Sequence, residues 1–161
     1  MTFERRPKKE MRPEAALIRL EELCARSEQC EYEIRRKLAS WQIAPDDADT
    51  IVRSLMRRRF VDDSRYAAAF VRDKYRFTGW GRRKIEQALK QKRISSDTIC
   101  EALEEIDEEE YRRIITSLVR RKAAALGGVT DYETRVKLLR FGVARGFEAS
   151  LVSEIIRELT K

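Results

Sequence analysis

The chain has 161 residues, of which 39% are charged and 42% hydrophobic, enough apolar surface to bury continuous seams between helices. Lysine and arginine outnumber aspartate and glutamate by seven, and the sequence pI is near 9.5, which favours an acidic partner such as nucleic acid. No stretch approaches the roughly 18–20 apolar residues that would span a bilayer, so no membrane partner is expected. The basic N-terminus lacks the apolar core of a secretory signal.

The composition also disfavours catalysis. Because the chain contains no histidine, it lacks every Ser-His and Cys-His nucleophile pair and the commonest general base. Cys24, Cys30 and Cys100 cannot all pair with one another, and a zinc site would need carboxylates to complete it. No glycine-rich loop is long enough to cradle a phosphate. We therefore expect no enzyme, no catalytic residue, no cofactor and no metal, and reduced structural cysteines typical of the cytoplasm.

Apolar residues recur along the chain with a period of about 50 positions. The first set is repeated 51 residues later without a gap, and again after a further 53 residues, where only Gly142 breaks the correspondence. The three sets are Ile34, Leu38, Ile43, Ala48, Val52 and Leu55, then Ile85, Leu89, Ile94, Ile99, Leu103 and Ile106, then Leu138, Phe147, Val152, Ile155, Ile156 and Leu159. Such a period indicates an array of small units that offers a long binding surface.

Within each repeat the apolar spacing is helical and predicts three helices. After a basic arm at residues 1–13, the first repeat spans residues 14–60. Its second helix is expected at residues 31–41, and its third begins at Pro45, which suits the first turn of a helix. The apolar face of its first helix consists of Ala16, Leu17, Leu20 and Leu23.

The second repeat spans residues 61–106 and the third residues 107–161, again with three helices each. The expected N-terminal caps are Asp62 or Asp63, Ser95 or Ser96, and Asp131. The expected helix stops are Gly79, Gly81, Gly127 and Gly128. The sequence therefore predicts an all-α chain of three tandem three-helix, helix-turn-helix-like repeats that form an elongated, curved array.

Positive charge is concentrated between Arg72 and Arg93, where nine basic residues face only two acids, a local net charge of +7. The aromatic residues interleaved with them are Tyr75, Phe77 and Trp80. Basic side chains with aromatics between them suit a polyanion that also offers flat bases. A solvated helix face is the alternative for the charges, and a place in the core is the alternative for Tyr75 and Phe77.

The candidate contact residues are the basic side chains of this window and of two helix ends. They are Arg72, Lys74, Arg76, Arg82, Arg83, Lys84 and Lys90, together with Arg57, Arg58, Arg120 and Arg121. On a helical wheel Arg83 and Lys90 point away from the core, and with Arg82 and Lys84 they are the strongest candidates. The clusters at residues 57–59 and 120–122 have an alternative role, since cations at helix C-termini complement the helix dipole.

Three motifs carry a resemblance to a known family. They are residues 60–67 (Phe60, Val61, Asp62, Asp63, Ser64, Arg65, Tyr66 and Ala67), residues 79–85 (Gly79, Trp80, Gly81, Arg82, Arg83, Lys84 and Ile85) and residues 89–94 (Leu89, Lys90, Gln91, Lys92, Arg93 and Ile94). On these residues the chain resembles RecX, a family of bacterial regulatory proteins that restrain the RecA recombinase. The resemblance covers residues 14–161. Gln42 and Arg93 stand where the family often has a glycine, as at Gly146.

The resemblance implies a negative regulator that binds the RecA–DNA filament and inhibits ATPase, strand exchange and co-protease activity. Its setting would be homologous recombination, DNA repair and the SOS response. The implied partners are the RecA filament and single-stranded DNA contacted through it, and we expect a cytoplasmic monomer. The residues themselves leave two other classes open: a helical array that binds naked DNA with a steep salt dependence, or a protein-only α-solenoid adaptor without DNA affinity.

Overall fold

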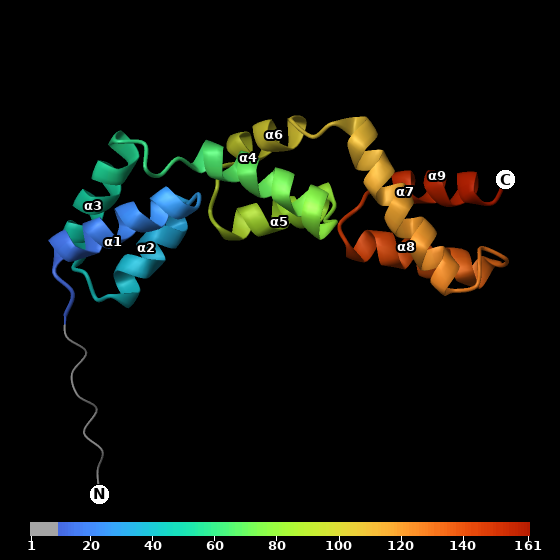
Figure 1. Ribbon diagram of the computed structural model, residues 1–161, viewed down its shortest axis with the longest axis horizontal. Helices are drawn as coiled ribbons and strands as arrows, with labels where there is room; N and C mark the ends of the chain where they lie inside the picture. Colours follow the sequence, from blue (N-terminus) through green and yellow to red (C-terminus); the bar gives the residue numbers. More distant parts are fainter. Residues whose placement is uncertain (1–9) are drawn as a thin grey trace, which may run out of the picture. The chain divides into compact units, whose positions relative to one another are not determined.

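The computed structural model describes residues 10–161, and all regular secondary structure in this part of the chain is helical, which confirms the predicted all-α fold of three-helix units. The helices are α1 (Pro13–Arg26), α2 (Glu31–Ser40), α3 (Pro45–Arg57), α4 (Asp63–Asp73), the π-helical turn η1 (Lys74–Thr78), α5 (Arg82–Gln91), α6 (Ser96–Glu104), α7 (Glu108–Ala125), α8 (Tyr132–Ala144) and α9 (Ala149–Leu159) (Figure 1). Most of the predicted basic arm, residues 1–13, lies outside the described residues.

The chain divides into two compact units, Met1–Tyr66 and Ala67–Lys161. Unit 1 contains α1, α2 and α3, and α3 packs against both of the others. Its core consists of the buried residues Ala16, Leu20, Ile34, Leu38, Ile43, Ile51, Val52, Leu55 and Val61. Each fully buried leucine or isoleucine contributes about 1.5–3 kcal/mol relative to an exposed one. The finer boundaries of the three sequence repeats stay a prediction.

The predicted helix caps fall where the sequence places them. The Thr98 amide donates to the Ser95 hydroxyl at 3.2 Å, and the Thr134 amide donates to Asp131 at 2.8 Å. At α4 the choice between two aspartates is settled in favour of Asp62, whose carboxylate accepts from the Arg65 amide at 3.0 Å. Asp63 instead accepts from the Glu31 amide at 2.9 Å and so caps α2. Each such cap contributes about 0.5–2 kcal/mol.

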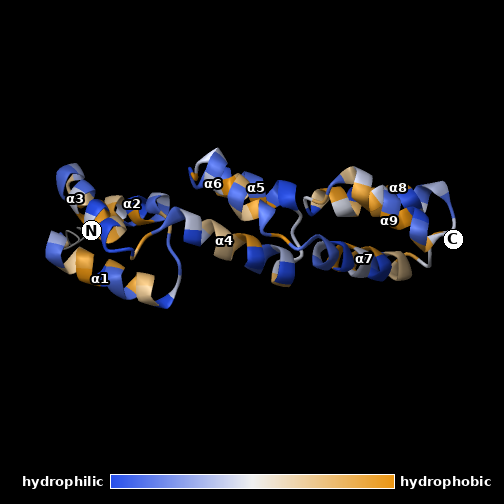
Figure 2. Ribbon diagram, turned by 90° about the horizontal axis from the view of Figure 1, so that it is seen from above, coloured by the Kyte–Doolittle hydropathy of each residue, from blue (hydrophilic) through white to orange (hydrophobic). Residues whose placement is uncertain are grey.

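In unit 2, helix α4 continues into the π-helical turn η1, which ends at Gly79 with a left-handed φ of 69°. This turn separates two aromatic residues that the sequence left undecided. Tyr75 is 1% exposed and belongs to the core, whereas Phe77 is 83% exposed at the surface. The apolar repeat positions of this unit are buried or half-buried, and its helices carry both hydrophobic and hydrophilic segments, as amphipathic helices do (Figure 2).

The start of α5 is joined to the end of α8 by main-chain contacts. The Gly81 amide donates to the Arg145 carbonyl at 2.7 Å, and the Arg83 amide donates to the Gly146 carbonyl at 3.1 Å. A Cβ atom at Gly81 would lie 2.1 Å from the Gly146 carbonyl carbon, so only glycine fits there. Helix α7 packs across α8 and α9 beside this junction (Figure 1).

Gly142, the single break in the apolar repeat, lies at the contact of α8 with α9. A Cβ atom at this position would come within 2.7 Å of a Val152 methyl group. The missing side chain therefore allows the close approach of the two helices, which explains why the repeat has a gap at this point.

Candidate functional site

The exposed side of α5 carries part of the predicted contact surface. We call Arg83, Lys84 and Lys90 the α5 face; these residues line a hollow of about 630 Å³ together with the end of α8. Arg83 is exposed and has no ion-pair partner among residues 10–161. Lys84 lies 4.6 Å from the centre of the Trp80 ring, a cation–π contact, and Lys90 pairs with Glu86 at 2.9 Å. The structure thus keeps these three predicted residues together at the surface.

Arg82, one of the strongest candidates, is engaged within the fold. Its guanidinium donates to Glu148 at 3.1 Å and to Glu108, and it lies 4.2 Å from the centre of the Tyr111 ring. The Tyr111 hydroxyl in turn accepts from the Arg82 amide at 3.1 Å and donates to Glu148 at 2.8 Å. Burial raises the pKa of Tyr111, so the phenol stays protonated. We call these four residues the Arg82 node; it joins α5, α7 and the start of α9.

The remaining predicted residues of the basic window also have partners nearby. Arg76 forms a bidentate ion pair with Glu110 at 2.9 and 3.2 Å, and this hydrogen bonding raises the pKa of the Arg76 guanidinium. Lys74 lies 4.5 Å from the centre of the Trp80 ring. Arg72 reaches Glu105 only at 3.9 Å, with about half of its side chain exposed.

In unit 1, the two predicted arginines differ. Arg58 pairs with Glu21 at 2.7 Å and lies 4.9 Å from the centre of the Phe60 ring. Arg57 is exposed and lines a small hollow of about 210 Å³ on α3. Both lie at the C-terminal end of α3, where their charge also complements the helix dipole.

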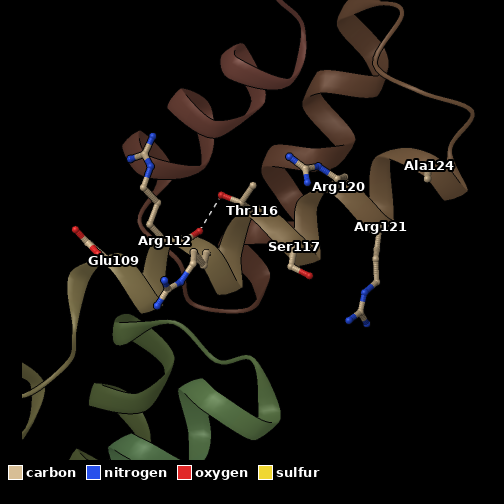
Figure 3. A pocket seen from close by; sticks show the side chains of 8 residues that line it. Glu109, Arg112, Thr116, Ser117, Arg120, Arg121 and Ala124 are labelled. Carbon is tan, nitrogen blue, oxygen red and sulfur yellow. Dashed lines mark hydrogen bonds between the residues drawn. The ribbon is translucent and has the colours of Figure 1, made fainter.

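Arg120 and Arg121 lie near the C-terminal end of α7 and line a hollow of about 700 Å³ (Figure 3). Figure 3 shows that the labelled side chains all come from α7 and that Arg112 and Arg121 leave the helix on opposite sides. Arg112 reaches α9, where it donates to Glu154 and Glu158 at 3.3 and 2.8 Å. Arg120 and Arg121 have no ion-pair partner within the described part of the chain.

A second hollow, of about 490 Å³, lies between the end of η1 and α7. We call it the arginine groove; it is lined by Arg76, Phe77, Thr78, Gly79, Glu110, Arg113, Ile114, Ser117, Leu118, Arg121 and Arg145. Arg145 donates to the Thr78 and Gly79 carbonyls at 3.3 and 3.4 Å and so holds one edge of the groove. Only Arg76 and Arg121 of its four arginines were predicted as contact residues. The spacing of Arg113, Ser117 and Arg121 at every fourth residue was the available signal for the missed Arg113.

No group of three or more potential metal ligands lies together within residues 10–161. The thiols of Cys24 and Cys100 have raised pKa values, because burial disfavours the Cys24 thiolate and Glu104 repels that of Cys100. None of the helices described combines the length and the apolar composition needed to cross a membrane.

Comparisons with known proteins agree with these features. The family described as RecX, second three-helix domain, matches residues 62–103. A regulatory protein RecX from Amycolatopsis mediterranei is 24% identical over 156 residues, which cover 94% of this chain and 89% of that protein. A regulatory protein RecX from Clostridium botulinum is 31% identical over 147 residues, covering 90% of this chain and 66% of that protein.

Some relatives are considerably longer: the chain spans 47% of the regulatory protein RecX from Lactobacillus johnsonii. The crystal structure of RecX from Lactobacillus salivarius superposes with a TM-score of 0.82 over 92% of this chain and 96% of that one, at 20% identity, which shows a shared fold. The family match in the middle of the chain, the named relatives across nine-tenths of it and the common fold lead to one conclusion. The chain belongs to the RecX family of regulatory proteins.

Proposed function

We propose that this chain is a negative regulator of the RecA recombinase that binds RecA–DNA filaments and inhibits their ATPase, strand-exchange and co-protease activities. The observation that carries the proposal is the similarity to regulatory proteins named RecX across nine-tenths of the chain. The basic surfaces of unit 2 support it, because a filament that contains DNA presents phosphates to a cationic partner. The chain would act as a monomer in the cytoplasm.

The α5 face is the part of the surface that we assign to the filament. Arg83 has no ion-pair partner within residues 10–161, and the Lys90 pair with Glu86 is exposed and of the kind that contributes only about 0.3–0.5 kcal/mol. Both charges are therefore available to a partner at little cost. Arg82, which the sequence groups with them, has its guanidinium committed to Glu108 and Glu148, so we assign it to holding the junction of α5, α7 and α9.

Steady-state ATPase of RecA on single-stranded DNA tests the proposal. We expect suppression when this protein is added at ratios to RecA well below one, because a bound regulator that stops filament extension affects many RecA subunits. A plain single-strand-binding protein serves as the control for simple competition for DNA. Unchanged ATPase together with tight binding to naked DNA would favour a direct DNA-binding array, and neither effect would favour a protein-only adaptor.

A further inference from the structure

The residues that line the arginine groove predict that it binds an anionic ligand, at a site separate from the α5 face. It lies wholly within unit 2, between η1 and α7, and its lining holds four arginines against the single acid Glu110. Arg76 already neutralises that acid through two hydrogen bonds. Arg113 and Arg121, in contrast, have no ion-pair partner within the described residues, so their charge is open to an anionic ligand.

The spacing of the two open arginines fits an extended anion. Arg113, Ser117 and Arg121 are four residues apart on α7 and share one face of the helix. At 1.5 Å per residue, the two arginines are separated by about 12 Å along the axis. Ser117 places a hydroxyl donor between them, a group that commonly binds phosphate oxygens. This arrangement suits several anionic groups in a row and not a single small ion.

The cationic surface continues beyond the groove along α7. Arg113, Ser117 and Arg121 also line the neighbouring hollow, which adds the exposed Arg120 and the half-buried Thr116 (Figure 3). The one acid that lines this hollow lies at one end: Glu109 is in the first turn of α7, whereas Arg120 and Arg121 lie near its last turn. A polyanion would therefore run from Arg113 toward the C-terminal end of α7, away from Glu109 and Glu110.

Phe77 distinguishes among the polyanions that could occupy the groove. Its side chain is 83% exposed, while its neighbours Tyr75 and Trp80 are buried or half-buried. Single exposed apolar side chains are common on proteins, so Phe77 alone identifies no ligand. Here, however, the ring lies at the rim of a groove with open arginines, and this combination of a stacking platform and cations is how proteins hold single-stranded nucleic acid.

We propose that the arginine groove binds a single-stranded nucleic acid, with one base stacked on Phe77 and the phosphates bound by Arg113 and Arg121. In a duplex the base faces are covered by their neighbours, so Phe77 has no flat surface to contact. An acidic peptide would use the arginines but has no base to place on the ring. The proposal extends the proposed function by naming the component of a filament that this groove contacts, and it is tested without RecA.

The test is the anisotropy of a fluorescein-labelled oligothymidylate of about 20 nucleotides, longer than the about 4–16 nucleotides that one single-strand-binding fold covers. We expect the Phe77→Ala substitution to weaken binding about 5- to 150-fold, the range for loss of one stacked base, without changing the salt dependence. Phe77→Trp should retain binding. The double substitution Arg113→Ala with Arg121→Ala should lower the slope of log K against log salt by about 1.4, since each phosphate contact in a single strand accounts for about 0.7.

Matched controls come from the same unit. Tyr132→Ala removes an aromatic side chain that is 82% exposed on α8, and Arg135→Ala removes an exposed arginine of that helix. Neither should change oligothymidylate binding. The proposal is wrong if wild-type protein does not bind the oligothymidylate, if Phe77→Ala matches Tyr132→Ala, or if a polyglutamate peptide competes as well as unlabelled oligothymidylate does. An equal loss of duplex and single-strand affinity in Phe77→Ala would also overturn it.

The RecA ATPase assay separates this inference from the proposed function. A protein that binds oligothymidylate through Phe77 but leaves RecA unaffected supports the groove and overturns the proposed regulation. A protein that suppresses RecA but shows no Phe77-dependent binding supports the regulation and overturns the groove. Thermal unfolding of each variant should match that of the wild type, because the substituted side chains are exposed.

Discussion

Three residues at equivalent positions of the repeats, Gln42, Arg93 and Gly146, have a left-handed backbone, with φ values of 58°, 55° and 93°. Each ends a helix through the same hydrogen bonds, in which the amide of the following residue donates to the carbonyl five residues before it. For a residue with a Cβ atom this conformation costs about 1–2 kcal/mol. The RecX family often has glycine at this position, and the positive φ explains why glycine suits it.

We expect Gln42→Gly to stabilise unit 1 by about 0.5–1 kcal/mol, the relief of left-handed strain less the entropy that glycine loses on folding. Urea unfolding followed by Trp41 fluorescence, in a Trp80→Phe background, measures this unit specifically. Ala39→Gly, at an exposed position inside α2, should instead destabilise by about 1 kcal/mol. A loss of stability in Gln42→Gly would show that the side chain makes a contact worth more than the strain.

Asp63 gives the second prediction at the scale of single residues. The Asp63 carboxylate accepts a hydrogen bond from the amide of Glu31, 32 residues earlier in the sequence. Burial raises the pKa of Asp63 above the ordinary value of 3.8. Because the folded protein disfavours the charged form, the stability of unit 1 should fall as the pH rises from 3.8 through the raised pKa. Asp63→Asn keeps an acceptor oxygen and removes the charge, so it should flatten this decline.

The measurement is the free energy of unfolding between about pH 4 and pH 7, again through Trp41. Asp63→Ala, which removes the acceptor, should lose about 0.5–2 kcal/mol as other N-cap substitutions do. A pH profile of Asp63→Asn identical to that of the wild type would mean that another group causes the decline.

At the scale of elements, the Arg82 node predicts that substitutions of two adjacent arginines, Arg82 and Arg83, have different effects on the stability of unit 2. Arg82→Ala should destabilise unit 2 by about 1–3 kcal/mol, because it removes hydrogen bonds to two carboxylates and leaves the half-buried Glu148 with Tyr111 alone. Arg83→Ala should stay within about 0.5 kcal/mol of the wild type, since its side chain is exposed. Urea unfolding followed by Trp80, in a Trp41→Phe background, reports on this unit.

Arg82→Lys is the informative companion, because lysine keeps the charge but lacks the planar fork that reaches both carboxylates. The stability of the Arg82→Lys protein should lie between those of the wild type and of Arg82→Ala. Equal stability of the Arg82→Ala and Arg83→Ala proteins would contradict the structural role and return Arg82 to the list of surface contacts.

The same elements show what sequence alone could and could not predict. The start of helix α6 was predictable, because the two candidate caps, Ser95 and Ser96, are a local signal and Ser95 caps the helix in the structure. The ion pairs of Arg82 could not be predicted, since its partners Glu108 and Glu148 lie 26 and 66 positions away in the sequence. The exposure of Phe77 was also hidden, because it follows from η1, whose wider turn changes the angle between successive side chains.

At the scale of the whole molecule, both proposals depend on where positive charge is left unpaired. The net charge of +7 coincides with that of the window from Arg72 to Arg93, yet much of that window is neutralised by acids elsewhere in unit 2. Arg83, Arg113, Arg120 and Arg121 are among the exposed arginines that have no ion-pair partner within the described residues. Local charge density in a sequence therefore predicts a polyanionic partner, whereas the unpaired side chains in the structure point to the surface that would meet it.

The last prediction tests the α5 face by charge reversal. Arg83→Glu with Lys90→Glu should weaken inhibition of the RecA ATPase, because both charges then repel the phosphates of the filament. The free energy of unfolding, measured by thermal denaturation, should stay within about 0.5 kcal/mol of the wild-type value, as for other substitutions at exposed positions. The matched control is Arg135→Glu with Lys137→Glu on α8, which changes the net charge equally and disrupts a comparable pair, that of Lys137 with Glu133. If both double variants inhibit RecA equally well, the α5 face has no part in the contact; if both are equally weak, the effect is one of overall charge.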